Sequence, residues 1–197
     1  SITDGERYAR DYLIDLYSDD TLPIDLRLGT SNNLSVSRDF SVTPKVGQYG
    51  FLLDFEDWTT DSDYTTEHNI TKDGFTIDAV GMVIGADDLN SSPISGSRSF
   101  VLNGGQRFDT YISISGLQGV GTVSMKVAPW KDGAGDSYAS LFVDADDKKV
   151  YSLHVSPFST VRTISVKINN PLTQQIRIYP YTSTQRNARI RIDDIRF

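Results

Sequence analysis

The sequence A-R-I-R-I-D-D-I-R-F at residues 188–197 carries the clearest strand pattern in the chain. Ile190 and Ile192 fall on one side and the arginines on the other, which is the period of a half-buried strand. At Asp193 and Asp194 this alternation slips by one position. The apolar side then continues only through a bulge or a twist at the Asp pair, since a one-residue slip turns every later side chain to the opposite face.

A strand of this kind is predicted to close a sheet, and its expected antiparallel partner is the apolar segment at residues 49–56, Y-G-F-L-L-D-F-E. Residues 47–197 are predicted to be almost entirely β, because many short alternating segments are separated by turn residues and no helical period interrupts them. The expected fold is an antiparallel jelly-roll β-sandwich. Its predicted strands are 49–56, 74–84, 97–103, 106–115, 120–128, 138–145, 148–154, 160–169, 174–180 and 187–197.

Two longer stretches between these strands, residues 59–69 and 85–96, are polar and are predicted to be irregular. The chain has 197 residues and is 38% hydrophobic, which is enough for one sizeable core. A net charge of -7 argues against nucleic acid or an anionic membrane as the main partner. The chain has no cysteine, which excludes disulfides, thiol catalysis and thiolate metal sites.

Residues 1–46 are predicted to form a separate N-terminal arm, made of a helix over residues 1–18 and two strands. Thr3 and Glu6 have the spacing of a capping box at the start of this helix. One side of the helix is rich in tyrosine and leucine and has no local cover, so it is expected to pack on another subunit or on the body of an assembly. The residues predicted to make this contact are Tyr8, Tyr12, Leu13 and Leu16.

Three motifs in the β region support a family resemblance: F-E-D-W at 55–58, G-S-R-S-F-V-L-N-G at 96–104 and I-D-D-I at 192–195. In this order and spacing they resemble the jelly-roll carbohydrate-binding modules of the galactose-binding-like superfamily. The resemblance covers residues 50–197 and concerns the fold. It is poorly specific for function, since this architecture carries sugar-binding modules, adhesins and structural virion domains.

The same resemblance implies a structural calcium ion that ties the first strand to the last. Carried over by motif, its ligands are Glu56 together with Asp193 or Asp194. The residue types suit calcium, which prefers several hard oxygen ligands. The alternative is that Glu56 pairs with an arginine such as Arg196, or is solvated.

Sugar binding requires an aromatic platform with polar groups around it. Trp130 is the first candidate, because it starts a glycine-rich loop between strong strands. The alternative is that Trp130 closes the end of the core. The polar candidates beside it are Lys131, Asp132 and Asp136, and the weaker aromatic candidates are Tyr64, Tyr179 and Tyr181.

Catalysis has little support in the sequence. His68 and His154 lie far apart, and His154 is most simply a partly buried strand residue. No nucleophile elbow, zinc-binding helix motif or phosphate-binding loop is present. A pair of glycosidase carboxylates cannot be picked out from the acidic residues by pattern. The prediction is therefore a protein that is not an enzyme, with a hydrolase as the distant alternative.

The N-terminal sequence Y-A-R-D-Y-L-I-D-L-Y-S-D-D-T-L-P-I-D-L at residues 8–26, followed by S-R-D-F-S-V-T-P at 37–44, is similar to the N-terminal segments of tailed-phage structural proteins. That resemblance implies a virion component (decoration, fibre or tail-associated) that is attached by the arm and displays the jelly roll, with host-surface glycan as a ligand. Its partners would be other virion subunits or further copies of the chain. The alternative is an extracellular, secreted or enzyme-appended carbohydrate-binding module.

Overall fold

The computed structural model describes residues 50–88, 91–106, 109–130, 136–184 and 186–197. Within these ranges the chain is all-β, with no helix, and every strand pairing is antiparallel. This confirms the predicted antiparallel β-sandwich. The strands are β1 (Leu52–Leu53), β2 (Thr66–Lys72), β3 (Phe75–Gly85), β4 (Arg98–Asn103), β5 (Tyr111–Ser115), β6 (Val120–Pro129), β7 (Ala139–Ala145), β8 (Lys148–Val155), β9 (Arg162–Asn170), β10 (Gln175–Tyr181) and β11 (Arg189–Arg196).

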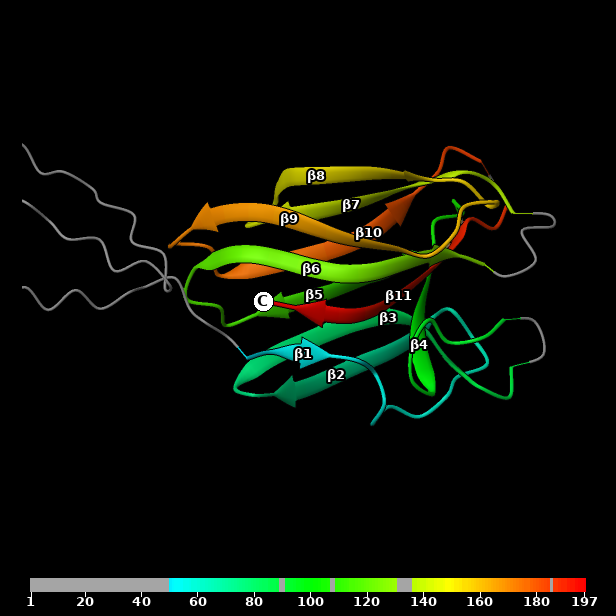
Figure 1. Cartoon of the computed structure of the whole chain (residues 1–197), viewed down its shortest axis with the longest axis horizontal. Helices are drawn as coiled ribbons and strands as arrows, with labels where there is room; N and C mark the ends of the chain where they lie inside the picture. The colour runs from blue at the N-terminus through cyan, green and yellow to red at the C-terminus, as the bar shows by residue number, and fades with distance from the viewer. Residues whose placement is uncertain (1–49, 89–90, 107–108, 131–135, 185) are drawn as a thin grey trace, which may run out of the picture.

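The strands form two layers, which we call sheet I and sheet II (Figure 1). Sheet I has the order β3-β4-β11-β6-β9, with the short β1 beside the end of β11. Sheet II has the order β8-β7-β10-β5-β3-β2. The long strand β3 belongs to both, because its first half pairs with β5 and its second half with β4.

The change of sheet along β3 takes place at Gly81. A Cβ at this position would lie 2.8 Å from the carbonyl oxygen of Val101 and would overlap the ring of Phe100. Phe100 is itself fully buried between the sheets. Only glycine lets β3 approach β4 closely enough to pass from one layer to the other.

Apolar side chains from both inner faces fill the space between the layers. Trp58, expected from its place after the first strand to be core, is buried at 7% exposure. Among the described residues, the cluster between the sheets draws its members from Phe51 to Phe197. Its largest fully buried side chains are Phe55, Phe100, Leu53, Ile77, Leu102, Ile112, Ile114, Met125, Leu141, Ile176 and Ile178.

The closing strand β11 behaves as its sequence predicts. It pairs antiparallel with β1, where Leu53 lies opposite Ile195, so the two ends of the described domain meet (Figure 1). Its register against β6 shifts between Asp193 and Arg196, and Asp194 has φ 50°. The bulge returns Ile195 to the core with no exposed surface, in line with Ile190 and Ile192 further up the strand.

The prediction that residues 59–69 are irregular holds for 59–65 and is wrong for 66–69, which begin strand β2. Its burial alternates, but the side chains on its inner side include Thr66 and His68, so the apolar signal is weak. The hairpin turn that joins it to β3 supplies the missing information. Asp73 and Gly74 both have positive φ (53° and 84°), which is the geometry that an Asp-Gly pair favours in a two-residue hairpin.

Other boundaries are shorter than predicted. The strand expected at 49–56 is regular only over β1, and the strand expected at 106–115 begins at Tyr111. The predicted arm at 1–46, with its helix and two strands, lies outside the described residues. Among the described residues, no helix is long and apolar enough to span a membrane.

Candidate functional site

The outer face of sheet II presents one side of strand β10 to solvent. Ile176 and Ile178 of this strand point into the core and have no exposed surface. The alternate residues point outward and are partly or largely exposed: Gln175, Arg177, Tyr179 and Tyr181. This alternation places one guanidinium and two phenols side by side on an open face.

An aromatic row crosses this face at right angles to the strands. Tyr179 lies opposite Phe142 of β7 in the register, with their ring centroids 5.4 Å apart. The register that pairs Ile178 with Ile112 places Tyr111 of β5 on the other side of Tyr179. We call Phe142, Tyr179 and Tyr111 the aromatic row.

A polar row runs beside the aromatic row on the same face, two residues away along each strand. Arg177 lies opposite Asp144 of β7 on one side and opposite Ser113 of β5 on the other. Asp78 of β3 lies opposite Ser113 and extends the row. Apolar faces and hydrogen-bonding groups thus follow parallel lines, as an amphipathic ligand such as a sugar requires.

Two adjoining cavities lie over the polar row and over Tyr111 and Tyr179 of the aromatic row, while Phe142 lines neither cavity. The larger has a volume of about 650 Å³ and is lined by Asp144, Arg177 and Tyr179, together with Tyr181 and the segment at Gly104–Gln106. The smaller has a volume of about 410 Å³ and extends over Tyr111, Ser113 and Asp78. Arg177 and Asp109 line both, so the cavities form one groove across the sheet, in the size range of small-molecule sites.

Cations lie on the rings of the aromatic row. The Arg177 guanidinium is 4.5 Å from the ring centroid of Tyr111 and 5.6 Å from that of Tyr179. Lys149 of β8 lies 3.5 Å from the ring centroid of Phe142. These contacts orient the long side chains, since a cation is attracted to the face of an aromatic ring.

Asp144 fixes the Tyr179 ring. The phenol of Tyr179 donates a hydrogen bond to Oδ2 of Asp144 at 3.1 Å. Burial and this hydrogen bond to a carboxylate both raise the pKa of the Tyr179 phenol above its ordinary value. The phenol therefore stays protonated and remains a donor at neutral pH.

Trp130, the sequence-predicted platform, lies elsewhere. Its side chain is 3% exposed and packs on the outer face of sheet I with Met82, Ile84 and Val101. The guanidinium of Arg189 covers its ring at 4.4 Å from the centroid. The indole offers no open face here, and its burial matches the alternative in which Trp130 belongs to a core.

The polar residues predicted beside Trp130 divide into two groups. Lys131 and Asp132 lie outside the described residues. Asp136 binds the guanidinium of Arg189, with its Oδ1 2.7 Å from Nη2 and 3.0 Å from Nε. Tyr64, one of the weaker aromatic candidates, packs on the same apolar cluster as Trp130.

The carboxylate predicted to start the calcium site, Glu56, holds the turn before β4. Its oxygens accept hydrogen bonds from the backbone N–H groups of Ser97 and Arg98 and from the Ser97 hydroxyl. The hydroxyl bond, aided by these backbone donors, lowers the pKa of Glu56 below its ordinary value. Gly96 permits the approach, because a Cβ there would meet the Glu56 carboxylate.

The Asp pair of β11 binds the same turn from the other side. Oδ2 of Asp193 accepts hydrogen bonds from the backbone and hydroxyl of Ser95 and from the Ser99 hydroxyl. Oδ2 of Asp194 accepts from Ser95 Oγ at 3.0 Å and lies 2.6 Å from Nζ of Lys126. Residues 95–99 thus link the segment after β1 to β11. In the calcium hypothesis a metal ion makes this link.

The donor set tests whether calcium fits at this place. The oxygen chemistry is suitable, and all three predicted carboxylates surround one turn. However, their oxygens already accept serine, backbone or lysine donors, and no group of three or more acidic or histidine side chains converges on one point in the described part of the chain. The calcium site stays a prediction, and no chemistry of the groove depends on it.

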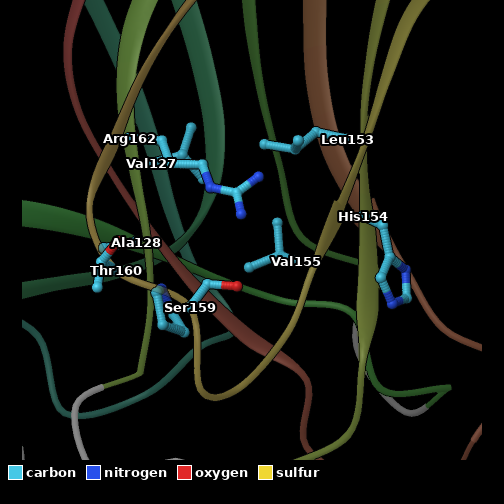
Figure 2. A pocket seen from close by; sticks show the side chains of 9 residues that line it. Val127, Ala128, Leu153, His154, Val155, Ser159, Thr160 and Arg162 are labelled. Carbon is cyan, nitrogen blue, oxygen red and sulfur yellow. The ribbon is translucent and has the colours of Figure 1, made fainter.

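Neither histidine lies in the groove. His68 Nε2 is 3.0 Å from the Asp61 carboxylate. His154 is exposed, which corrects its predicted partial burial, and it stacks on Tyr138 with centroids 5.2 Å apart. Near His154 a small cavity lies between β6, β8 and the start of β9, with the Arg162 guanidinium reaching toward Val155 (Figure 2). Its volume of about 10 Å³ holds at most one water molecule, so it is no ligand site.

Sequence reasoning named Tyr179 and Tyr181 only as weaker candidates and missed the other groove residues. One usable signal was present. In Q-I-R-I-Y-P-Y at 175–181 two of the four outward positions are tyrosines, beside an arginine, and a face that only needs solvation does not require such aromatic side chains. The side chains missed include Asp78, Asp109, Tyr111, Ser113, Asp144, Asp147, Gln175 and Arg177 of the groove, and Phe142 of the aromatic row.

No family model matches this chain, and no curated protein matches it. Among solved structures, the K2 cleaved adhesin domain of Lys-gingipain is similar, with a TM-score of 0.50 and 17% identity over 74% of this chain and 95% of that chain. A CBM51 module of a Clostridium perfringens GH95 protein, in complex with methyl-galactose, has a TM-score of 0.43 and 13% identity over 74% of this chain and 98% of that chain. The first shows the shared β-sandwich fold, and no argument rests on the second.

Proposed function

We propose that this protein binds carbohydrate, without catalysis, in the groove on the outer face of sheet II. One observation carries the proposal: the polar row and two rings of the aromatic row, Tyr111 and Tyr179, line a pair of joined cavities. A sugar ring has an apolar face and a rim of hydroxyls, so it matches a surface of aromatic and hydrogen-bonding lines. The two histidines, the most common acid–base residues, lie away from this groove.

The test is a glycan array probed with the full chain and with two single variants. Tyr179→Ala removes the middle of the aromatic row and should abolish or strongly weaken binding, by at least tenfold. Phe158→Ala is the matched control. Phe158 is also an aromatic residue with an exposed side chain (80% exposed), but it lies in the β8–β9 loop and lines neither cavity. Equal loss in both variants, or no array binding by the unaltered chain, would reject the proposal.

We also propose that the groove is displayed on a larger assembly, as a virion component attached by residues 1–46. The support is the resemblance of residues 8–26 and 37–44 to phage structural proteins, together with the uncovered tyrosine-rich face expected in the predicted helix. A secreted or enzyme-appended module is the competing function. The size of the purified full chain separates them: an assembly component forms a multimeric particle or joins one, whereas an appended module is a monomer.

A further inference from the structure

Two polar atoms in the groove are buried and have no hydrogen-bond partner within the part of the chain that the structure describes. One is Oδ1 of Asp144, and the other is Nε of Arg177. They belong to residues that face each other across β7 and β10, yet no ion pair joins these two side chains among the described residues. A buried polar atom without a partner is costly, so a free acceptor and a free donor on two residues that lie opposite each other in the register suit a ligand that pairs with both.

We propose that Asp144 and Arg177 select a neutral sugar by binding two neighbouring hydroxyls; this rests on the proposed function of the groove. One hydroxyl donates its hydrogen to Oδ1 of Asp144, and the next accepts the N–H of Arg177 Nε. Tyr179 holds the other oxygen of Asp144, so its free oxygen is oriented before the ligand arrives. The rings of Tyr111 and Tyr179 restrict the guanidinium in the same way.

The charge of the groove favours a neutral ligand over an acidic one. Four carboxylates line the two cavities and one guanidinium lies among them. An acidic sugar would gain one contact with Arg177 but would face repulsion from Asp144 and from the remaining carboxylates, Asp78, Asp109 and Asp147. A pair of hydroxyls satisfies the free donor and the free acceptor without adding charge.

The experiment measures binding of the full chain to small sugars by saturation-transfer NMR and titration. The probes are the methyl glycosides of glucose, galactose, mannose and xylose, with glucuronic acid as the acidic counterpart of glucose. We expect a neutral glycoside to bind and glucuronic acid to bind at least tenfold more weakly, because the carboxylates of the groove repel an acid. An acidic probe that binds as well as or better than every neutral one overturns the proposal.

Variants then test the two residues. Asp144→Asn changes the free acceptor into a donor at nearly constant shape and should weaken binding of the neutral glycoside by about tenfold, since a single such bond contributes about 1 to 2 kcal/mol. Arg177→Gln should act similarly. Glu67→Gln, an exposed acid-to-amide change on β2 outside both cavities, is the control and should have no effect.

Deoxy analogues of the bound glycoside identify the hydroxyls. Removing the hydroxyl that contacts Asp144 should weaken binding to the unaltered chain. The same deoxy analogue should bind the Asp144→Asn variant almost as well as the parent glycoside binds that variant, because the two changes remove the same bond. If Tyr179→Ala abolishes binding while Asp144→Asn and Arg177→Gln bind normally, the selection proposal fails and the carbohydrate function stands. If no probe and no array glycan binds the unaltered chain, the function itself fails.

Discussion

The carboxylate of Asp193 accepts a hydrogen bond from the hydroxyl of Ser99 across 2.7 Å, and neither residue has any exposed surface (0% each). Ser99 lies on β4 and Asp193 on β11, so the bond joins two neighbouring strands of sheet I at the point where β11 bulges. The same carboxylate oxygen accepts the backbone N–H of Ser95. One buried acid therefore holds both the bulge and the turn before β4.

We expect Asp193→Ala to destabilise the domain by about 2 to 4 kcal/mol, because it leaves several buried donors unsatisfied. Asp193→Asn should destabilise the domain clearly less than Asp193→Ala, since it keeps one acceptor oxygen. It also removes a buried negative charge, and burial raises the pKa of this acid. Urea unfolding monitored by tryptophan fluorescence measures both. Equal stability of the alanine variant and the unaltered chain would show that the network does not hold the bulge.

Asp194 should make stability fall in acid. Burial opposes its ionisation, but hydrogen bonds from Lys126 and Ser95 hold its pKa below the ordinary value of 3.8. An acid whose folded-state pKa is lowered contributes stability above its unfolded pKa, and this contribution is lost as the pH falls through the folded pKa. Between pH 5 and strong acid, melting curves of Asp194→Asn should therefore shift less than those of the unaltered chain. A parallel shift of both would contradict this assignment.

Trp130→Ala should lower the free energy of unfolding by about 3 to 5 kcal/mol, as expected for truncation of a buried tryptophan. The reason is its 3% exposure and its packing on Met82, Ile84 and Val101. Thermal melting measures the loss. A variant that melts like the unaltered chain but no longer binds glycan would restore Trp130 as a sugar platform and remove that role from the groove.

Calcium binding at Glu56, Asp193 and Asp194 can be tested directly. An ion bound only by the folded state stabilises it by about 2.7 kcal/mol at 100 times its dissociation constant. The melting temperature should rise with calcium and fall with a chelator, and Glu56→Gln should remove this response while Glu67→Gln keeps it. If the midpoint of the unaltered chain does not respond to either addition, the hydrogen bonds of Ser95 and Ser97 alone link β1 to β11.

Deletion of residues 1–46 should leave a folded β-sandwich, because the described residues from Phe51 to Phe197 already provide a core cluster from both sheets. Circular dichroism should show a β-type spectrum and cooperative melting. The deleted chain should also be unable to join the assembly that Tyr8, Tyr12, Leu13 and Leu16 are predicted to contact. Loss of cooperative unfolding would mean that the arm is part of the domain.

The sequence by itself determined the class of the fold, the closing strand β11, its partner β1 and the bulge at the Asp pair. These features depend on short-range information: alternation over a few residues decides which side of a strand faces the core, and a slip in that alternation requires a bulge. Strand β2 escaped notice because its inner side chains, including Thr66 and His68, are only weakly apolar. Its pairing with β3 comes from the neighbouring strand and from the turn at Asp73 and Gly74.

Only the tertiary structure decided the site. Asp144 and Arg177 lie far apart in the chain and meet because β7 and β10 are neighbours in sheet II, and strand order follows from how the whole core packs. In the same way, Trp130 follows a strand and looks available in the sequence, but a second apolar cluster on the outer face of sheet I covers it. A local pattern shows which side chains point outward. It does not show which outward side chains share a surface, since that depends on contacts between distant segments.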